Sequence, residues 1–142
     1  MSKLSAFLHP VRPVNEEREV FVSDRFVGED GEPLKFKIRA LSQEENERLR
    51  KLCTRPKKVN GQQVEEFDGS EFANLVVVEA TLFPDFRSKE LCDGLGVVNP
   101  SKAPGLLLKS GEFARLSGAI LSLSAFDDSP EGEARIETDV KN

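Results

Sequence analysis

The sequence of 142 residues contains no Trp and no Tyr, and it has only one His and two Cys. The single histidine, His9, excludes metal sites that are built on two histidines, such as His-Glu-x-x-His. Cys53 and Cys92 lie too far apart for a zinc-binding or redox motif, so we expect both thiols in the core. A Cys–His nucleophile pair would depend on His9, which lies in a proline-containing N-terminal segment. We therefore predict no catalytic, cofactor-binding or metal-binding residues.

Long apolar runs and nucleotide-binding motifs are also missing. No run approaches the roughly 18 apolar residues of a membrane-spanning helix, and the first residues lack the apolar region of a signal peptide. The patterns Gly-x-Ser-x-Gly and Gly-x-x-x-x-Gly-Lys do not occur. Carboxylates are numerous, but they cluster at predicted helix starts and near the C-terminus, where capping and solubility explain them. These absences favour a cytoplasmic binding protein that is not an enzyme.

Charge is unevenly distributed along the chain, whose net charge is −5. Residues 127–142 hold six acids and two bases, which accounts for −4 of that total. The stretch from Arg48 to Lys58 is the opposite, with six bases and no acid. Because no aromatic residues alternate with these bases to stack on nucleobases, a solvated helix end and loop is the favoured interpretation. Nucleic-acid binding through this stretch is the alternative, and it would weaken steeply with salt.

Residues 19–41 have the pattern of an antiparallel β-hairpin. Apolar residues alternate with Lys35, Lys37 and Arg39, as in a strand with one buried and one solvated face. Residues 28–33 are rich in Gly and acidic residues and end in Pro, which favours a turn between two strands. We predict a first strand containing Val20, Phe21, Val22 and Phe26, and a second containing Leu34, Phe36, Ile38 and Ala40.

Helical signals dominate the rest of the chain. Ser42 and Glu45 form a capping box, which predicts a helix from there to about residue 53. Residues 70–83 are the most apolar stretch, and their i, i+3, i+4 spacing predicts a helix that Pro84 ends. The β-branched run at residues 76–78 leaves a strand as the alternative there. Further helices are expected over residues 88–95, 104–108 and 110–124.

The predicted fold class is therefore α+β: an N-terminal antiparallel β-hairpin followed by a mainly α-helical domain of about four to five helices. Residues 54–67 are polar and contain Asn60-Gly61, so we expect either a mobile loop or a small two-stranded flap there. We divide the chain into a flexible arm at residues 1–18, a single α+β domain at 19–126, and an acidic mobile tail at 127–142.

The N-terminal arm carries an apolar patch formed by Leu4, Phe7 and Leu8. Pro10 and Pro13 follow, and they prevent a regular helix beyond one turn. Two interpretations of the patch are open: it packs on the core of its own chain, or it docks on another protein.

A series of short motifs runs in order from about residue 18 to residue 126, and the order and spacing are more specific than any single motif. The motifs are Ser23-Asp24-Arg25-Phe26, Asp30-Gly31-Glu32-Pro33, Ile38-Arg39-Ala40, Glu44-Glu45, Leu49 to Thr54, Phe83-Pro84-Asp85-Phe86, Glu90-Leu91, Gly94-Leu95-Gly96-Val97, Leu107-Leu108-Lys109, and Gly111-Glu112-Phe113-Ala114 with Leu116. In this order the chain resembles the XkdN-like tail assembly chaperones of tailed phages and defective prophages.

The resemblance implies a non-enzymatic role in the cytoplasm of the bacterial host. Such a protein holds the tape-measure protein in solution while tail-tube subunits polymerise around it. The implied partners are the tape-measure protein and, less directly, the tail-tube protein, with no membrane, small-molecule substrate or cofactor. A homo-oligomer is left open. A structural tail component is the nearest alternative, and a small nucleic-acid-associated protein using Arg48 to Lys58 is the other.

Partner contacts are expected on two apolar surfaces, because a chaperone for exposed helices needs apolar area of its own. The first surface is the arm, and the second is the exposed remainder of the helix around residues 111–123. The residues that we assign to them are Leu4, Phe7, Leu8, Phe113, Leu116 and Ile120.

Overall fold

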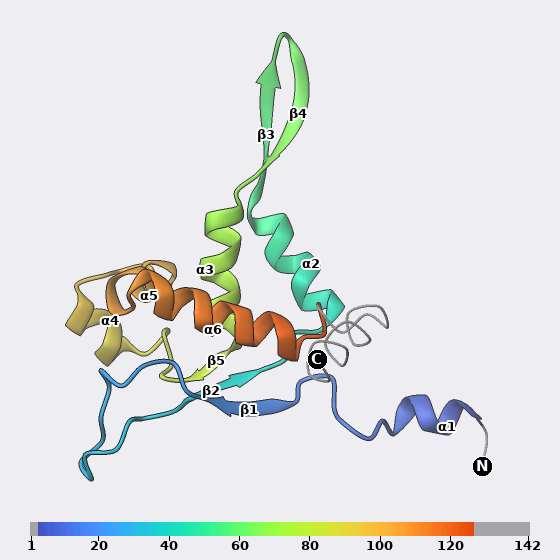
Figure 1. Cartoon of the computed structure of the whole chain (residues 1–142). Coiled ribbons are helices and arrows are strands. Elements are labelled where there is room, and N and C mark those ends of the chain that lie inside the picture. Colours follow the sequence, from blue (N-terminus) through green and yellow to red (C-terminus); the bar gives the residue numbers. More distant parts are fainter. Residues whose placement is uncertain (1–2, 127–142) are drawn as a thin grey trace, which may run out of the picture.

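The computed structural model describes residues 3–126, and the predicted acidic tail at 127–142 lies outside the described residues. The fold is α+β, as predicted. A three-stranded antiparallel sheet has the order β1-β2-β5, and a separate two-stranded ribbon is formed by β3 and β4 (Figure 1). The strands are β1 (Glu17–Val20), β2 (Phe36–Arg39), β3 (Thr54–Val59), β4 (Gln62–Phe67) and β5 (Thr81–Phe83).

Six α-helices and one 3-10 helix lie within residues 3–126, so the helical part is slightly larger than the four to five helices predicted. The 3-10 helix, η1, comprises Pro100–Lys102. The α-helices are α1 (Lys3–Leu8), α2 (Gln43–Leu52), α3 (Gly69–Ala80), α4 (Lys89–Leu95), α5 (Ala103–Leu107) and α6 (Ser110–Leu123).

The predicted N-terminal hairpin is present as β1 and β2, but its first strand is displaced. Glu17 pairs with Arg39 and Val20 with Phe36, so β1 ends where the prediction had it begin. The reason is that Val22 leaves the sheet and is fully buried in the core. The alternation predicted for the second strand is confirmed at Phe36 and Ile38, which are buried while Lys37 between them is exposed. Leu34 and Ala40 lie outside β2, and Leu34 is exposed.

The apolar stretch at residues 70–83 is only partly helical. Helix α3 begins after Asp68, whose side chain accepts a hydrogen bond from the Glu71 amide at 3.0 Å, and it ends at Ala80. Thr81 and Phe83 instead pair with β2, opposite Ile38 and Lys37. The helix prediction is therefore wrong for these last three residues, because backbone pairing with β2 competes with one more turn of helix.

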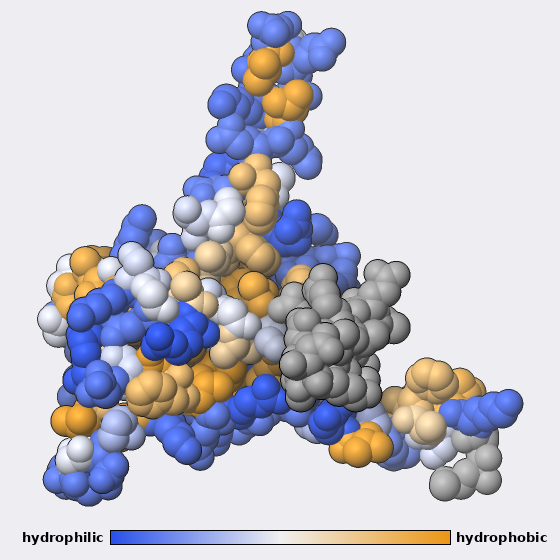
Figure 2. All heavy atoms as spheres, in the orientation of Figure 1, coloured by the Kyte–Doolittle hydropathy of each residue, from blue (hydrophilic) through white to orange (hydrophobic). Residues whose placement is uncertain are grey.

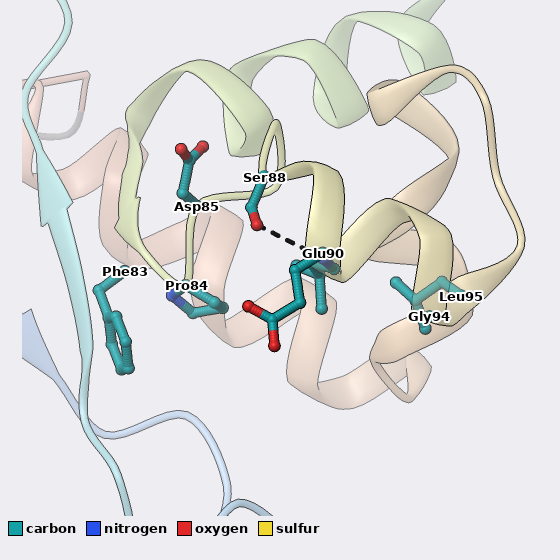
Figure 3. Close-up of a pocket in the computed structure, with 8 residues that line it drawn as sticks. Phe83, Pro84, Asp85, Ser88, Glu90, Gly94 and Leu95 are labelled. Carbon is teal, nitrogen blue, oxygen red and sulfur yellow. Dashed lines mark hydrogen bonds between the residues drawn. The ribbon is translucent and has the colours of Figure 1, made fainter.

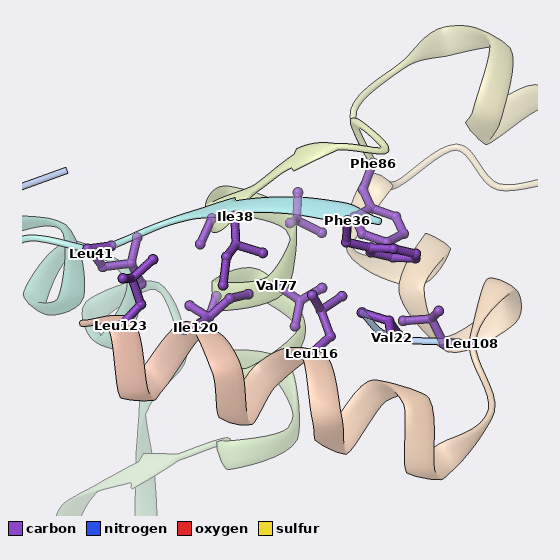
Figure 4. Close-up of a cluster of buried hydrophobic side chains, with 14 of the residues drawn as sticks. Val22, Phe36, Ile38, Leu41, Val77, Phe86, Leu108, Leu116, Ile120 and Leu123 are labelled. Carbon is purple, nitrogen blue, oxygen red and sulfur yellow. The ribbon is translucent and has the colours of Figure 1, made fainter. Parts of the chain in front are cut away.

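The core lies between one face of the three-stranded sheet and the helices α3 and α6 (Figure 4). Ile38 of β2, Val77 of α3, and Leu116 and Ile120 of α6 meet there, and all four are 0% exposed. Phe86, from the loop after β5, is buried at the same depth. The layer thus joins residues from both halves of the chain, and it fixes how β5 and the loop after it are placed.

Helix α2 begins with the predicted capping box. The Ser42 hydroxyl accepts from the Glu45 amide at 3.2 Å, and the Glu45 carboxylate accepts from the Ser42 amide at 3.0 Å. From the far ends of α2 and α3, the ribbon of β3 and β4 extends away from the body (Figure 1). Asn60 and Gly61 at its tip both have positive φ, 53° and 79°, as a two-residue hairpin turn requires. The two-stranded alternative is therefore the one present.

Candidate partner-binding surfaces

Helix α1 is the most exposed apolar element of the described chain. It stands away from the body, and its apolar side chains form a separate patch (Figures 1 and 2). Leu4, Phe7 and Leu8 are 70%, 82% and 75% exposed, and no residue of α1 is buried. Their i, i+3, i+4 spacing places them on one stripe of the helix. The arm does not pack on its own core in this structure, so the stripe is free to contact another chain.

The second predicted surface, on α6, is mostly not a surface. Leu116 and Ile120 are 0% exposed, because the stripe that contains them faces the sheet and α3. Phe113 is partly buried against the same core. A partner could reach Leu116 or Ile120 only if the core opened, so of the three residues predicted on α6 only Phe113 is accessible.

A groove that the sequence did not reveal lies between the end of β5 and α4 (Figure 3). Its volume is about 550 Å³, and Phe83, Pro84, Leu91 and Leu95 supply its apolar lining. In Figure 3, Phe83 and Pro84 lie on one side and Gly94 and Leu95 on the other. A local feature of the sequence could have indicated this groove. Helix α4 contains Leu91, Gly94 and Leu95, so its apolar face has a position without a side chain.

The groove is acidic, because its two acids carry uncompensated charge while the nearby bases are paired with other acids. Asp85 and Glu90 both line it, and within residues 3–126 neither forms a salt bridge. The Arg87 guanidinium is bound by Glu79, and Lys89 Nζ lies 2.9 Å from Asp93 Oδ2. Asp85 Oδ1 accepts a hydrogen bond from the Arg87 amide at 3.0 Å. A ligand that enters the groove therefore meets apolar walls and the carboxylate of Glu90.

An ion pair joins two of the motifs that lie far apart in the sequence. Arg25 Nε donates to Glu112 Oε2 at 2.8 Å, and Arg25 Nη2 donates to Oε1 at 2.5 Å. Hydrogen bonds from Arg25 first, and then from Ser23, hold the pKa of Glu112 well below its usual range. Arg115 also donates to the Val22 carbonyl. These contacts attach the loop after β1 to the start of α6, so the Ser23–Phe26 and Gly111–Ala114 motifs have a structural role.

Most of the basic stretch from Arg48 to Lys58 is engaged within the chain. Arg48 binds Glu79 at 2.5 Å, and Arg55 binds Glu71 at 2.9 Å. Lys57 pairs with Glu66 at 2.8 Å, and Arg50 lies over the ring of Phe67, 4.4 Å from its centroid. Neutralised bases attract phosphates weakly, so this geometry weighs against the nucleic-acid alternative.

Glu79 is the acceptor on which the basic side chains of three elements converge. Arg39 of β2, Arg48 of α2 and Arg87 of the loop before α4 all approach its carboxylate. Burial raises the pKa of Glu79, but hydrogen bonds from Arg87 and Arg48 more than offset it, so the pKa lies below its ordinary value. The cluster ties α3 to its neighbours and leaves no unpaired group that points to chemistry.

Within the described residues, no three or more His, Cys, Asp or Glu side chains are grouped so that they could hold a metal ion. None of the helices between residues 3 and 126 is both long and apolar enough to cross a membrane.

Comparisons with known proteins identify the family. The model of the phage XkdN-like tail assembly chaperone family matches residues 4–138. The protein XkdN of the phage-like element PBSX of Bacillus subtilis (strain 168) is 30% identical over 140 residues, which cover 96% of this chain and 93% of XkdN. The YqbN protein of the same strain is 34% identical over 118 residues, covering 82% of this chain and 79% of YqbN.

A solved structure agrees in fold. The crystal structure of YqbN superposes with a TM-score of 0.73 at 26% sequence identity, over 89% of this chain and 99% of that one. The family model matches nearly the whole sequence, and the similarity to XkdN covers most of both chains; the two findings point to the same conclusion. The chain belongs to the family of phage XkdN-like tail assembly chaperones.

Proposed function

We propose that this chain is a chaperone that binds the tape-measure protein during tail assembly, in the cytoplasm of the bacterial host, and that it catalyses no reaction. The family is one of assembly chaperones and not of enzymes, which implies protein partners. The observation that carries the proposal is the exposed apolar stripe of Leu4, Phe7 and Leu8 on α1. A long helical client exposes apolar stripes before the tube covers it, and a short apolar helix is suited to pair with them.

The size of the stripe argues for weak and reversible binding. Full burial of one Leu or Phe side chain stabilises a complex by about 1.5–3 kcal/mol. Association costs about 4–15 kcal/mol in lost translational and rotational freedom, so three such side chains leave little surplus. A client that offers many sites in a row would gain from several bound copies at once. Each copy would still leave readily when tube subunits arrive.

The test is co-expression of this chain with the tape-measure protein from the same genome. We expect the tape-measure protein to enter the soluble fraction and to co-purify with the chain. Leu8→Glu should reduce the recovered complex at least about tenfold, because a charge would replace apolar area that the complex buries. Val11→Glu is the matched control, since it places the same charge on the same arm outside α1.

Two outcomes would contradict the proposal. A tape-measure protein that stays insoluble and unbound beside the wild-type chain would show that the client is a different one. Recovery of this chain in purified mature tails, in stoichiometric amounts, would make it a structural tail component instead.

A further inference from the structure

We propose that the α1 stripe of one copy docks in the Phe83–Leu95 groove of a second copy, so that two chains exchange arms. The same stripe is proposed above to contact the tape-measure protein, so the two partners would compete for it. The inference itself concerns the chain alone and is tested without the tape-measure protein. Three observations carry it: the shapes of the two surfaces, their charges, and their positions on the body.

The two surfaces match in shape. The stripe offers three large apolar side chains within little more than one helical turn. The groove is lined by Phe83, Pro84, Leu91 and Leu95, and it is open to solvent along α4. A Cβ built at Gly94 meets no atom within 4 Å, so the backbone of a second helix can approach closely there.

The two surfaces also match in charge. Residues 3–12 carry two bases, Lys3 and Arg12, and no acid. The groove presents the carboxylate of Glu90, and Asp85 at its edge, whose Oδ1 accepts from the Arg87 amide, adds a second negative charge; the neighbouring bases are already paired. Docking would therefore bring opposite charges together around an apolar centre, which favours this occupant over an acidic one.

The positions of the surfaces favour a second copy over the same chain. The arm leaves the sheet at Glu17 in the edge strand β1, whereas the groove begins at Phe83 in β5, the opposite edge strand, and extends to α4. Helix α1 and helix α4 lie on opposite sides of the body in Figure 1. An exchange of arms between two copies lets each α1 reach a groove without folding back, and it closes with two-fold symmetry.

A six-residue helix is itself an indication that a binding partner exists. Isolated helices shorter than about 12–15 residues are marginal in water, and α1 buries none of its residues in its own chain. Packing in a groove would supply the stabilisation that its length cannot.

The experiment is analytical ultracentrifugation of the purified chain over a concentration series. We expect a dimer that dissociates on dilution. Phe7→Glu and Gly94→Gln should each weaken it at least about tenfold, the first by charging the stripe and the second by filling the groove. Val11→Glu and Gly118→Gln are the matched controls. Gly118 lies in α6, it is exposed, and a Cβ added there also meets nothing within 4 Å.

Mixing the two variants isolates the contact. A Phe7→Glu chain retains its groove and a Gly94→Gln chain retains its stripe, so an equimolar mixture should regain a dimer with one intact contact. A second readout uses Leu8→Cys in one tagged chain and Gly94→Cys in another, with disulfide formation between them. The native Cys53 and Cys92 are buried and do not compete.

The inference is overturned by a wild-type chain that stays monomeric at every concentration, or by a dimer that both variants leave unchanged. If the chain is a monomer and Gly94→Gln detaches α1 from the groove, then α1 docks in the groove of its own chain. That result also overturns the proposed exchange of arms. Because all of these measurements use the chain alone, they fail or succeed separately from tape-measure binding.

Discussion

At the residue scale, Glu45 shows how one side chain serves two purposes. Its carboxylate completes the capping box of α2, and it also accepts two hydrogen bonds from Arg39, at 3.0 and 2.8 Å. The Arg39 hydrogen bonds first, and the Ser42 amide after them, lower the pKa of Glu45 from 4.5 to about 2, against the effect of burial. The ionised form of Glu45 is thus favoured by folding.

A pH dependence of stability follows from that pKa. A carboxyl whose pKa is lower in the folded state stabilises the fold above its unfolded pKa, and the contribution is lost as pH falls. For Glu45 the loss should occur between about pH 4.5 and pH 2. We expect urea unfolding to show a smaller decrease in the free energy of unfolding over this range for Glu45→Gln than for the wild type.

The partner variant provides the control for this prediction. Arg39→Met should flatten the same part of the pH profile. The double variant should be little flatter than Arg39→Met alone, because Arg39 pairs with Glu45 and also lies 3.6 Å from Glu79. Unchanged profiles in both single variants would show that the pair does not form in solution.

Residue-scale features were predictable only where the partners are close in sequence. Ser42 and Glu45 are three positions apart, so the capping box could be read directly. Arg25 and Glu112 are 87 positions apart, and their pairing depends on how the loop after β1 meets α6. No local pattern distinguishes Glu112 from the many exposed acids at helix starts.

At the scale of elements, α6 carries a glycine that its packing does not require. A Cβ at Gly118 meets no atom within 4 Å, and the position lies inside a helix. Gly118→Ala should therefore raise the free energy of unfolding by about 1 kcal/mol, since alanine loses less backbone entropy on folding. Urea denaturation would measure the change.

The opposite sign is expected for a glycine that ends a helix. Gly96 caps α4 with a positive φ of 73°, so Gly96→Ala should lower the free energy of unfolding although space is available. A Gly118→Ala variant that is less stable than the wild type would contradict the prediction, and would indicate close packing on that face.

Element boundaries were less predictable than element existence, for reasons that particular residues show. Thr81 to Phe83 continue the apolar rhythm of α3, yet hydrogen bonding to β2 makes them a strand. Residues 17–19 show no alternation of apolar and polar side chains, yet they form a strand because their backbone pairs with β2. On α6 the spacing of Leu116 and Ile120 revealed a shared face, but it could not reveal that the sheet covers that face.

At the scale of the whole molecule, the ribbon of β3 and β4 lies outside the core. Every residue of β4 is exposed, and the ribbon is joined to the body at its base, where Phe67 packs 5.4 Å from Phe72. We expect a chain in which a short Gly-Ser linker replaces residues 55–66 to keep its fold. No core residue is lost, and the exposed pair of Arg55 with Glu71 contributes little.

Thermal unfolding followed by circular dichroism would measure this effect. The melting temperature should change by no more than about 5 °C, given the small energies of exposed ion pairs. A much larger decrease would show that the ribbon stabilises α2 and α3 from outside the core. If the melting temperature is unchanged but tape-measure binding is impaired, the ribbon contacts the tape-measure protein and does not stabilise the fold.

The class of the whole fold could be predicted, but the relation between its surfaces could not. Alternation at residues 34–40 and helical spacing further along were sufficient for α+β. The groove combines the end of β5 with α4, and its position opposite α1 depends on the packing of Phe86 and the sheet. Such relations arise only from tertiary structure.

The two edge strands of the three-stranded sheet affect whether this chain aggregates at high concentration. An exposed strand edge is a template on which further strands can add, and uncontrolled addition leads to aggregates. Here β1 forms one edge with the charged residues Glu17, Arg18 and Glu19, and β5 forms the other with only three residues before Pro84. Charge, shortness and proline each oppose such addition. The sheet of this chain is thus protected against polymerising edge to edge.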